Sequence, residues 1–494
     1  MSKQAKFICI ICTVVAISAF QSRKETLEEV FIKINQEVLY RGKAYTALGE
    51  ATSKIGHRLT GSTNGKKAEE FAFNFFREAG FTDVKYMPFE VETWSRDTVS
   101  LAIAPSNSDN YRDVEVVALA QSPVSAHVTE RIVDCGDGLE TDFEAIKDEL
   151  KGKVALMNIG ISLDKNKEQK NLHRSEKTAL AIKYGAVGVI IANQVKGGVL
   201  LTGTASVTGG LIEIPAVCIS YESGLQVRKW MKDEPNAKLL AVIDMRNFSR
   251  PIKARNIIAT IKGSSRKYRN EKIVIGGHLD SWDLAQGATD NGIGSFSVLD
   301  IARTFKALKL APKRSIEFVL FMGEEQGLLG SRAFIKKMKA DGKIDQIKLM
   351  MNLDMANNPK GFNAFGRNDL KQFFMEVGEQ IKNVDSTYTN TNFSQAGLHS
   401  DHQGFMLEGI PVCSPMGGLP IKTLNCYHAN CDRFDLVDKN QMLNTVRFST
   451  MMLYALANTD AIPSKKYTSD ETKEYLIKQK LKNELVIGKD WRWD

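Results

Sequence analysis

The sequence predicts an α/β protein in which a mostly parallel mixed sheet is flanked by helices and carries a smaller inserted β/α domain. Two observations lead to this fold class. Apolar, strand-like runs alternate with helical periodicity from residue 255 onwards, and a second, compact alternation of the same kind fills the middle third of the chain. The length of 494 residues is enough for two or three domains, and 43% hydrophobic and 25% charged residues are ordinary for a globular protein.

The first part of the chain has helical character followed by strand character. Apolar residues recur near 3.6-residue spacing between residues 25 and 79, which predicts helices on both sides of a glycine-containing loop at 56–62. Alternation of apolar and polar residues over 83–91 then predicts a strand.

The middle third has the pattern of a compact β/α unit. Buried strands are predicted at 153–160, 185–193 and 214–220, and short helices at 177–184 and 224–231. Such a unit can bury its own core, so we expect it to form a separate domain.

The last part has the clearest α/β alternation. Helical periodicity over 293–305 fills one interval between the predicted strands, which are 257–262, 272–277, 316–322, 348–355 and 410–413. Open α/β sheets collect their ligands at the carboxyl ends of the strands, so we look for the functional site there.

These elements suggest a division into domains. We expect the main domain to comprise residues 20–115 and 251–465, with the inserted domain at 116–250 and a charged tail at 466–494. The tail has Leu476, Ile477, Leu481 and Leu485 at helical spacing. We favour a helix packed on its own domain here, and a homodimer contact is the alternative.

The N-terminus has the layout of a secretory signal peptide over residues 1–19. Lys3 and Lys6 precede an apolar stretch from Phe7 to about Phe20, and small residues follow for cleavage. The stretch is short for a bilayer span, although a retained anchor is the alternative. We therefore expect a secreted or periplasmic, in any case extracytoplasmic, protein without a stable membrane span in the mature chain.

The charge distribution bears on nucleic-acid binding, and the cysteine content bears on disulfide bonds. The formal net charge is +8, but both signs are spread along the chain, and no basic run is interleaved with aromatic residues, so nucleic-acid binding is not expected. Five cysteines follow the signal peptide, and Cys426 could pair with Cys431 or with Cys413 in an oxidising compartment.

Polar residues of metal-binding type follow the predicted strands of the last part. His278 comes directly after a buried run, and Asp280, two residues on, can orient the imidazole from the same face of an extended segment. Asp290 opens a helix, where it is either a plain N-cap or a carboxylate that bridges two cations. Asp354 ends another strand, and His428 lies in a loop.

The pair Glu324-Glu325 ends the apolar run 318–322. Two unpaired carboxylates at such a position are costly to desolvate, so we expect cations to accompany them. One carboxylate would bind metal, and the other would stay free to move a proton. Glu324 is the candidate for the free one.

Taken together, these residues resemble the M28 family of zinc peptidases that use two metal ions, and the branch that contains carboxypeptidase Q in particular. The resemblance rests on His278-x-Asp280, Asp290-Asn291-Gly, Glu324-Glu325, Asp354 and Tyr427-His428. The inserted domain is similar to the protease-associated domain, through the segments 185–191 and 214–217.

The resemblance implies a role for each position. His278, Asp290 and Asp354 would surround one zinc ion, and Asp290, Glu325 and His428 the other. Glu324 would be the general base, and Asp280 would support His278. Substrate-binding roles would fall to Tyr427, Asn291 and Asp401. Asp401 belongs to a Ser-Asp-His segment that is either pocket-lining or structural.

The expected function is therefore an exported exopeptidase with two zinc ions that hydrolyses short peptides. An aminopeptidase needs acidic groups for a free ammonium, whereas a carboxypeptidase or dipeptidase needs basic groups for a terminal carboxylate. Charged candidates of both signs are Asp401, Asp432, Arg367 and Lys422. We favour an aminopeptidase or dipeptidase. The alternatives are a carboxypeptidase acting on dipeptides, a non-catalytic receptor-like homologue and a single-zinc glutaminyl cyclase.

Overall fold

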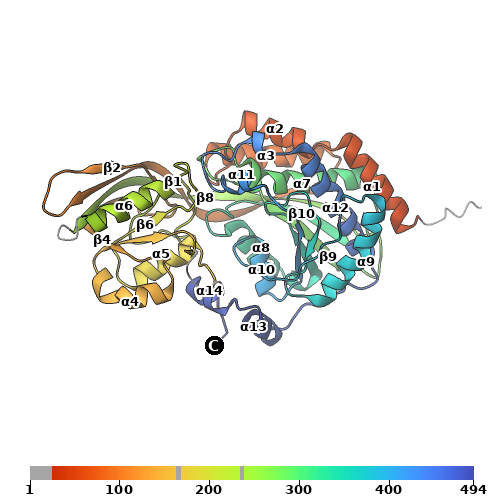
Figure 1. The fold of residues 1–494 in the computed structure, drawn as a ribbon. Helices are drawn as coiled ribbons and strands as arrows, with labels where there is room; N and C mark the ends of the chain where they lie inside the picture. Colours follow the sequence, from red (N-terminus) through yellow and green to blue (C-terminus); the bar gives the residue numbers. More distant parts are fainter. Residues whose placement is uncertain (1–24, 163–168, 234–237, 494) are drawn as a thin grey trace, which may run out of the picture.

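The computed structural model describes residues 25–162, 169–233 and 238–493, and it has two lobes side by side (Figure 1). The larger lobe is built from the N-terminal helices and the last part of the chain. The smaller lobe is built from the middle third. The expected signal peptide lies outside the described residues.

The larger lobe is organised around parallel strands. β9 (Lys272–His278) lies between β10 (Ser315–Phe321) and β11 (Ile347–Asn352), and all three are parallel. β13 (Val412–Met416) is parallel to β11, and β12 (Gly361–Asn363) closes this edge in antiparallel orientation. The predicted mostly parallel mixed sheet is therefore confirmed.

Helices cover this sheet. α7 (Ile293–Ala307) packs on β9 and β10, α12 (Lys439–Asn458) packs on α7, and both helices are buried over most of their length. The other helices of the lobe are α1 (Leu27–Arg41), α2 (Ala44–Lys54), α3 (Thr63–Glu78), α8 (Leu329–Ala340), α9 (Asn368–Val384), α10 (His402–Leu407) and α11 (Ile421–Leu424). The N-terminal helices predicted on both sides of the loop at 56–62 are thus present.

The smaller lobe is the predicted β/α unit. Its strands are β3 (Val116–Ala118), β4 (Ser125–Asp134), β5 (Val154–Asn158), β6 (Gly188–Ala192) and β7 (Ala216–Ile219). Strands β4 to β7 are parallel in the order of the sequence, and β3 joins β7 in antiparallel orientation. Its helices are α4 (Glu140–Leu150), α5 (Arg174–Lys183) and α6 (Tyr221–Asp233).

Two long strands connect the lobes. β1 (Val84–Pro105) and β8 (Leu239–Ile261) pair in antiparallel orientation along their whole length, and β8 also pairs with β4 on one side and β10 on the other. Short β2 (Arg112–Val114) pairs with β1. Residue 250, where the expected second boundary falls, therefore lies inside a continuous strand. The sequence pattern predicted only one end of each long strand.

The C-terminal tail forms α13 (Ser469–Lys478) and α14 (Lys482–Ile487). Leu476, Leu481 and Leu485 are buried in the core of the larger lobe, as expected for a tail that packs on its own chain. A search of the described residues finds no helix long and apolar enough to cross a membrane.

Candidate metal centre

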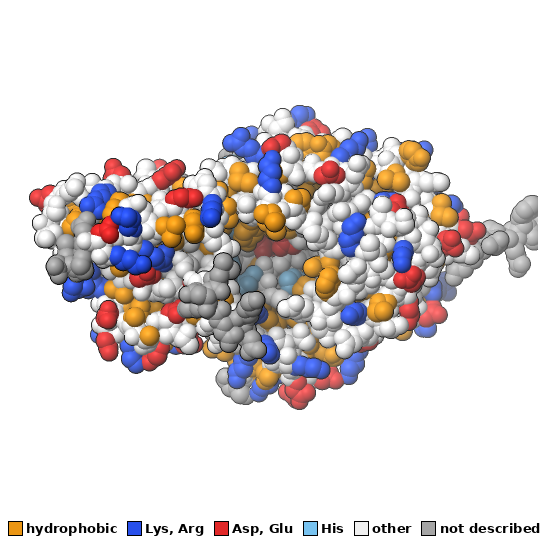
Figure 2. All heavy atoms as spheres, viewed as in Figure 1, with side chains coloured by type: hydrophobic (Ala, Val, Ile, Leu, Met, Phe, Trp, Pro, Cys, Tyr) orange, Lys and Arg blue, Asp and Glu red, His pale blue; other side chains and the backbone are white. Residues whose placement is uncertain are grey.

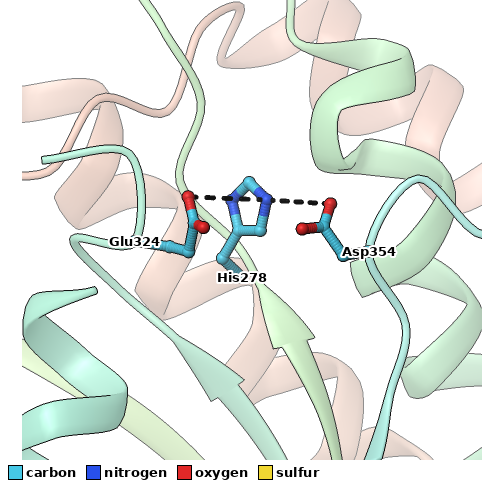
Figure 3. A group of neighbouring side chains, drawn as sticks. All are labelled: His278, Glu324 and Asp354. Carbon is cyan, nitrogen blue, oxygen red and sulfur yellow. Dashed lines mark hydrogen bonds and ion pairs between the residues drawn. The ribbon is translucent and has the colours of Figure 1, made fainter. Parts of the chain in front are cut away.

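The candidate site lies where three parallel strands end. His278 is the last residue of β9, Glu324 and Glu325 follow β10 after a two-residue turn, and Asp354 follows β11 after Leu353. Because neighbouring parallel strands end at the same edge of a sheet, these side chains meet there. Figure 3 shows Glu324 and Asp354 on opposite sides of the His278 ring.

Two groups of side chains share Asp290. The Nε2 atom of His278 lies 3.3 Å from Asp290 Oδ1 and 3.4 Å from Asp354 Oδ1. On the other side, His428 Nε2 lies 3.0 Å from Asp290 Oδ2 and 3.0 Å from Glu325 Oε2. Each oxygen of the Asp290 carboxylate thus faces a different histidine. Glu324 Oε2 is more distant, at 4.0 Å from His278 Nε2.

Asp290 is held by a second carboxylate. Asp432 accepts hydrogen bonds from the Thr289 amide at 2.8 Å, the Thr289 hydroxyl at 2.7 Å and the Asp290 amide at 3.0 Å. The Asp290 side chain makes no capping hydrogen bond at the start of α7. The plain N-cap interpretation of Asp290 is therefore not the one that the geometry supports. Asp432, one of the acidic candidates for substrate, instead braces the backbone of this turn.

His278 is oriented through its other ring nitrogen. The backbone oxygen of Asp280 lies 3.1 Å from His278 Nδ1, whereas the Asp280 carboxylate is 3.7 Å away. That carboxylate accepts hydrogen bonds from the Thr60 hydroxyl at 3.1 Å and the Glu324 amide at 3.3 Å. Asp280 therefore ties the ends of β9 and β10 together, and its main contact with His278 is through the backbone. Ser400 similarly donates to Asp354 Oδ2 at 2.6 Å.

The loop that carries His428 is constrained from both lobes. A disulfide joins Cys426 to Cys431, which settles the pairing that the sequence left open. The Thr202 amide of the smaller lobe donates to the His428 backbone oxygen at 3.0 Å, and the Thr202 oxygen lies 3.3 Å from His428 Nδ1. The Tyr427 ring stacks on the His428 ring with centroids 3.9 Å apart.

Burial and neighbouring charges shift the pKa values of the acidic groups at this site. Burial, together with the Asp354 and Glu325 carboxylates, raises the pKa of Glu324 well above its usual range. Burial and neighbouring Asp290 likewise raise the pKa of Glu325 to about 7, although His428 opposes this. For Asp290, burial is outweighed by hydrogen bonds with His278 and His428, which hold its pKa below the usual value.

This donor set fits divalent metal ions. Glu325 Oε1 is buried and has no hydrogen-bond partner among the residues that the structure describes. Four carboxylates face only two imidazoles, and a buried excess of negative charge is expected to bind cations. Ligand atoms that surround zinc in a tetrahedron at about 2.0–2.2 Å lie about 3.4 Å from one another, and the contacts of 3.0–3.4 Å are of this size.

The candidate metal-binding residues lie on the floor of a cavity of about 230 Å³ between the lobes. Figure 2 shows the hollow, with acidic and histidine side chains at its base. The smaller lobe contributes the start of α5 and the segment 204–207, and the C-terminal tail contributes a further wall. Tyr427 lines the cavity, and so do His399 and Gln403, which flank the Ser-Asp-His segment at 400–402, whereas the three residues of that segment do not.

Several candidates for substrate contact lie elsewhere. Asn291 and Asp401 are fully buried and do not line the cavity. Asn291 instead donates to the backbone oxygens of His278 at 3.3 Å and Leu353 at 2.9 Å, so it holds the strand ends in place. Arg367 is buried against the Tyr467 ring, outside the cavity. Lys422 does not line the cavity either.

Sequence reasoning missed the cavity residues of the smaller lobe. Arg174 lines the cavity, is only 5% exposed, and donates from Nη2 to His428 Nδ1 at 2.9 Å. The rings of His173 and His399 stack with centroids 4.5 Å apart, and Glu176 lies 3.3 Å from His399. No spacing pattern links residues 173–176 to the strand ends, because α5 reaches the site only through the packing of the lobes.

The sequence is similar to those of known peptidases. Residues 256–453 match the family model for peptidase family M28, and residues 120–227 match the PA domain. Mouse (Mus musculus) carboxypeptidase Q is 25% identical over 425 residues, which cover 85% of this chain and 87% of that protein. Leucine aminopeptidase 2 of Trichophyton rubrum is 27% identical over 378 residues, which cover 74% of this chain and 68% of that protein.

Solved structures show the same fold. A peptidase M28 precursor from Shewanella amazonensis superposes with a TM-score of 0.74 at 22% identity, over 90% of this chain and 99% of that one. An aminopeptidase from Aneurinibacillus sp. strain AM-1 has a TM-score of 0.64 at 24% identity, over 88% and 97%. A zinc aminopeptidase from Bacillus subtilis has a TM-score of 0.63 at 23% identity, over 86% and 97%.

The fold, the residues at the strand ends and these likenesses define a metallo-exopeptidase. Residues 256–453 match peptidase family M28, residues 120–227 match the PA domain, and the chain is similar to carboxypeptidase Q over most of both lengths. The resemblance noted in the sequence is thereby confirmed.

Proposed function

We propose that the protein is an exported exopeptidase that holds two zinc ions and hydrolyses short peptides with a free carboxyl end. His278, Asp290 and Asp354 would hold one ion, and Asp290, Glu325 and His428 the other. The observation that carries this proposal is the Asp290 carboxylate, whose two oxygens lie 3.3 Å and 3.0 Å from two different histidines. The zinc aminopeptidase from Bacillus subtilis supports zinc as the metal.

Zinc, when bound, supplies Lewis acidity that lowers the pKa of water and polarises a carbonyl group. The protein supplies the proton transfer. Glu324 Oε2 lies 4.0 Å from His278 Nε2, farther than the Asp290 and Asp354 oxygens, which lie at 3.3 Å and 3.4 Å. It is therefore the carboxylate left to accept a proton from the attacking water and to pass it to the leaving amine. Its raised pKa means that it holds a proton taken from water more readily than an ordinary glutamate does.

Arg174 supports a substrate with a free carboxylate. Its guanidinium is nearly buried, its Nε has no hydrogen-bond partner, and no carboxylate lies within ion-pair distance among the described residues. Buried charges are normally paired with an opposite charge, so a buried cation without a carboxylate partner at the wall of a cavity indicates an anionic ligand.

A metal on His428 would free Arg174 from that ring. An imidazole that binds metal through Nε2 carries its hydrogen on Nδ1, and the Thr202 oxygen at 3.3 Å can accept that hydrogen. Such a nitrogen no longer accepts from Arg174 Nη2, which lies 2.9 Å away, so the Arg174 N–H groups would turn to the carboxylate of a peptide. This favours a dipeptidase or carboxypeptidase over an aminopeptidase, which is a shift from the preference that the sequence suggested.

The proposal can be tested by metal analysis together with turnover of a dipeptide. The wild type should hold two zinc ions per chain and lose activity in a chelator. Glu324→Gln should keep the metal content but lower kcat roughly 10²- to 10⁴-fold, the usual contribution of a general base. The Asp290→Asn protein should hold fewer than two zinc ions per chain, because the substitution weakens both sets of zinc ligands.

Four results would contradict the proposal. Full turnover by Glu324→Gln would exclude its role as base, and two retained ions in Asp290→Asn would exclude the bridge. Metal binding without hydrolysis of any peptide would favour a receptor-like protein. One ion per chain with formation of pyroglutamate from an N-terminal glutamine peptide would favour a glutaminyl cyclase.

The extracytoplasmic location belongs to the same proposal. It rests on the N-terminal residues 1–19 and on the Cys426–Cys431 disulfide, a bond that persists in oxidising compartments. Mass spectrometry of the exported protein, with a mature N-terminus after about residue 19, tests it.

A further inference from the structure

The C-terminal tail forms one wall of the active-site cavity. Four of its residues line the cavity together with the metal-binding groups, namely Glu484, Leu485, Gly488 and Asp490. In Figure 1, α14 lies between α5 of the smaller lobe and the larger lobe, and it contacts α5. The tail thus occupies the gap between the lobes on one side of the cavity.

The tail is anchored to both lobes. On the larger lobe, Asp490 accepts hydrogen bonds from both Nη atoms of Arg332 at 2.7 Å and from Gln403 Nε2 at 2.7 Å. On the smaller lobe, Glu484 pairs with Lys170 at 2.7 Å. Glu484 is only 6% exposed, and a two-pronged pair such as Asp490 with Arg332 is specific in geometry as well as favourable. The anchors hold α14 across the gap.

The core of the larger lobe also retains the tail. Leu485 is 1% exposed and packs in the same cluster as Leu476 and Leu481, while Val486, the next residue of α14, is 50% exposed. Two adjacent positions on one helix therefore differ in environment: Leu485 contributes to the cavity wall, and Val486 faces solvent.

The enclosed space is small. A cavity of about 230 Å³ is below the roughly 300–1,000 Å³ of sites for drug-sized ligands. Each further extended residue of a peptide needs about 3.3–3.6 Å of length. With the metal-binding floor below, α5 on one side and the tail on another, a longer peptide meets α14.

We propose that the C-terminal tail determines substrate length, and that residues 481–493 restrict the enzyme to peptides of two or three residues. This inference rests on the proposed peptidase function of the same cavity. Leu485 is the specificity-determining residue of the wall, and Asp490 is a positioning residue that holds the wall through Arg332 and Gln403.

The test compares kcat/KM for a pentapeptide and for a dipeptide with the same scissile bond. Leu485→Ala removes bulk from the wall, Asp490→Asn weakens its anchor, and a chain ending at residue 480 removes it. Each should raise the pentapeptide-to-dipeptide ratio at least tenfold over the wild type. Val486→Ala, on the solvent side of the same helix, is the matched control and should leave the ratio unchanged.

Each outcome is decisive. If Leu485→Ala and Asp490→Asn fold, as judged by thermal unfolding, and keep the wild-type ratio, the length-limiting role is overturned. If kcat/KM falls equally for both peptides, the tail has only a structural role and the inference also fails. If the wild type cleaves the pentapeptide as well as the dipeptide, the wall does not restrict length. Absence of cleavage of either peptide by the wild type would instead refute the proposed function.

Discussion

Replacement of Arg174 by Gln is the most informative perturbation of this enzyme. It removes the positive charge that we assign to the substrate carboxylate and keeps a polar side chain beside His428, whose Nδ1 lies 2.9 Å from Arg174 Nη2. The Thr202 oxygen, 3.3 Å from Nδ1, can still accept the hydrogen of a metal-bound His428. Metal binding should therefore persist while recognition of a free carboxyl end is lost.

The magnitude follows from the burial of Arg174. An exposed ion pair contributes about 0–1 kcal/mol, but Arg174 is 5% exposed, so water does not screen it in this way. A hydrogen bond to a charged group is worth about 1.5–3 kcal/mol. At about 1.4 kcal/mol per factor of ten, kcat/KM should fall roughly 10- to 150-fold.

The assay compares a dipeptide with its C-terminal amide, for example alanyl-alanine and alanyl-alaninamide. Arg174→Gln should lose activity on the free acid but not on the amide, so the acid-to-amide ratio should fall by the factor given above. Arg332→Gln is the matched control, because Arg332 lines the same cavity but already pairs with Asp490. It should leave the acid-to-amide ratio unchanged.

A second variant moves the guanidinium without removing its charge. A Cβ atom at Gly203 would lie 1.9 Å from Arg174 Nε, so Gly203→Ala must displace the side chain, and it should show the same selective loss. Equal loss on acid and amide with reduced zinc content would refute carboxylate recognition and assign Arg174 to the support of His428. An unchanged acid-to-amide ratio in Arg174→Gln would refute it as well.

Two further predictions concern the metal loop and the response to pH. The Cys426–Cys431 disulfide spans the residues around His428, so Cys426→Ser with Cys431→Ser should weaken zinc binding in a chelator competition, and an unchanged affinity would contradict this. Burial lowers the pKa of His402 from about 6.5 in the unfolded chain to about 4, so its contribution to stability is present above pH 6.5 and is lost as the pH falls towards 4. Urea unfolding should show a loss of up to about 3 kcal/mol between pH 7 and pH 4 that is absent in His402→Gln, and parallel loss in both proteins would exclude His402 as the cause.

Local pattern was enough to predict which side chains gather at the candidate metal centre. His278, the Glu324-Glu325 pair and Asp354 each follow an apolar run, and their meeting requires only that the three strands be parallel neighbours. The structure has this arrangement. The sequence left the role of Asp290 undecided between a helix N-cap and a carboxylate that bridges two cations. The choice depends on His428, which is 138 positions away in the sequence.

The same reasoning failed for residues whose role depends on packing. Asn291 and Asp401 share the sequence neighbourhood of the site but are buried outside the cavity, where Asn291 holds backbone oxygens instead of substrate. Their positions in the sequence indicated that they lie close to the site, but not whether their side chains face the cavity.

The sequence by itself determined the fold class, the family resemblance and the candidate metal ligands, including Glu324 and Glu325. Strand ends and their polar residues are local features, and parallel pairing brings them together wherever such strands are neighbours. Only the tertiary structure decided what surrounds the metal centre. Arg174 and Leu485 come from segments about a hundred or more residues away from the strand ends, and they reach the cavity because the two lobes and the tail pack against each other. Long-range packing of this kind leaves no periodic trace in the sequence.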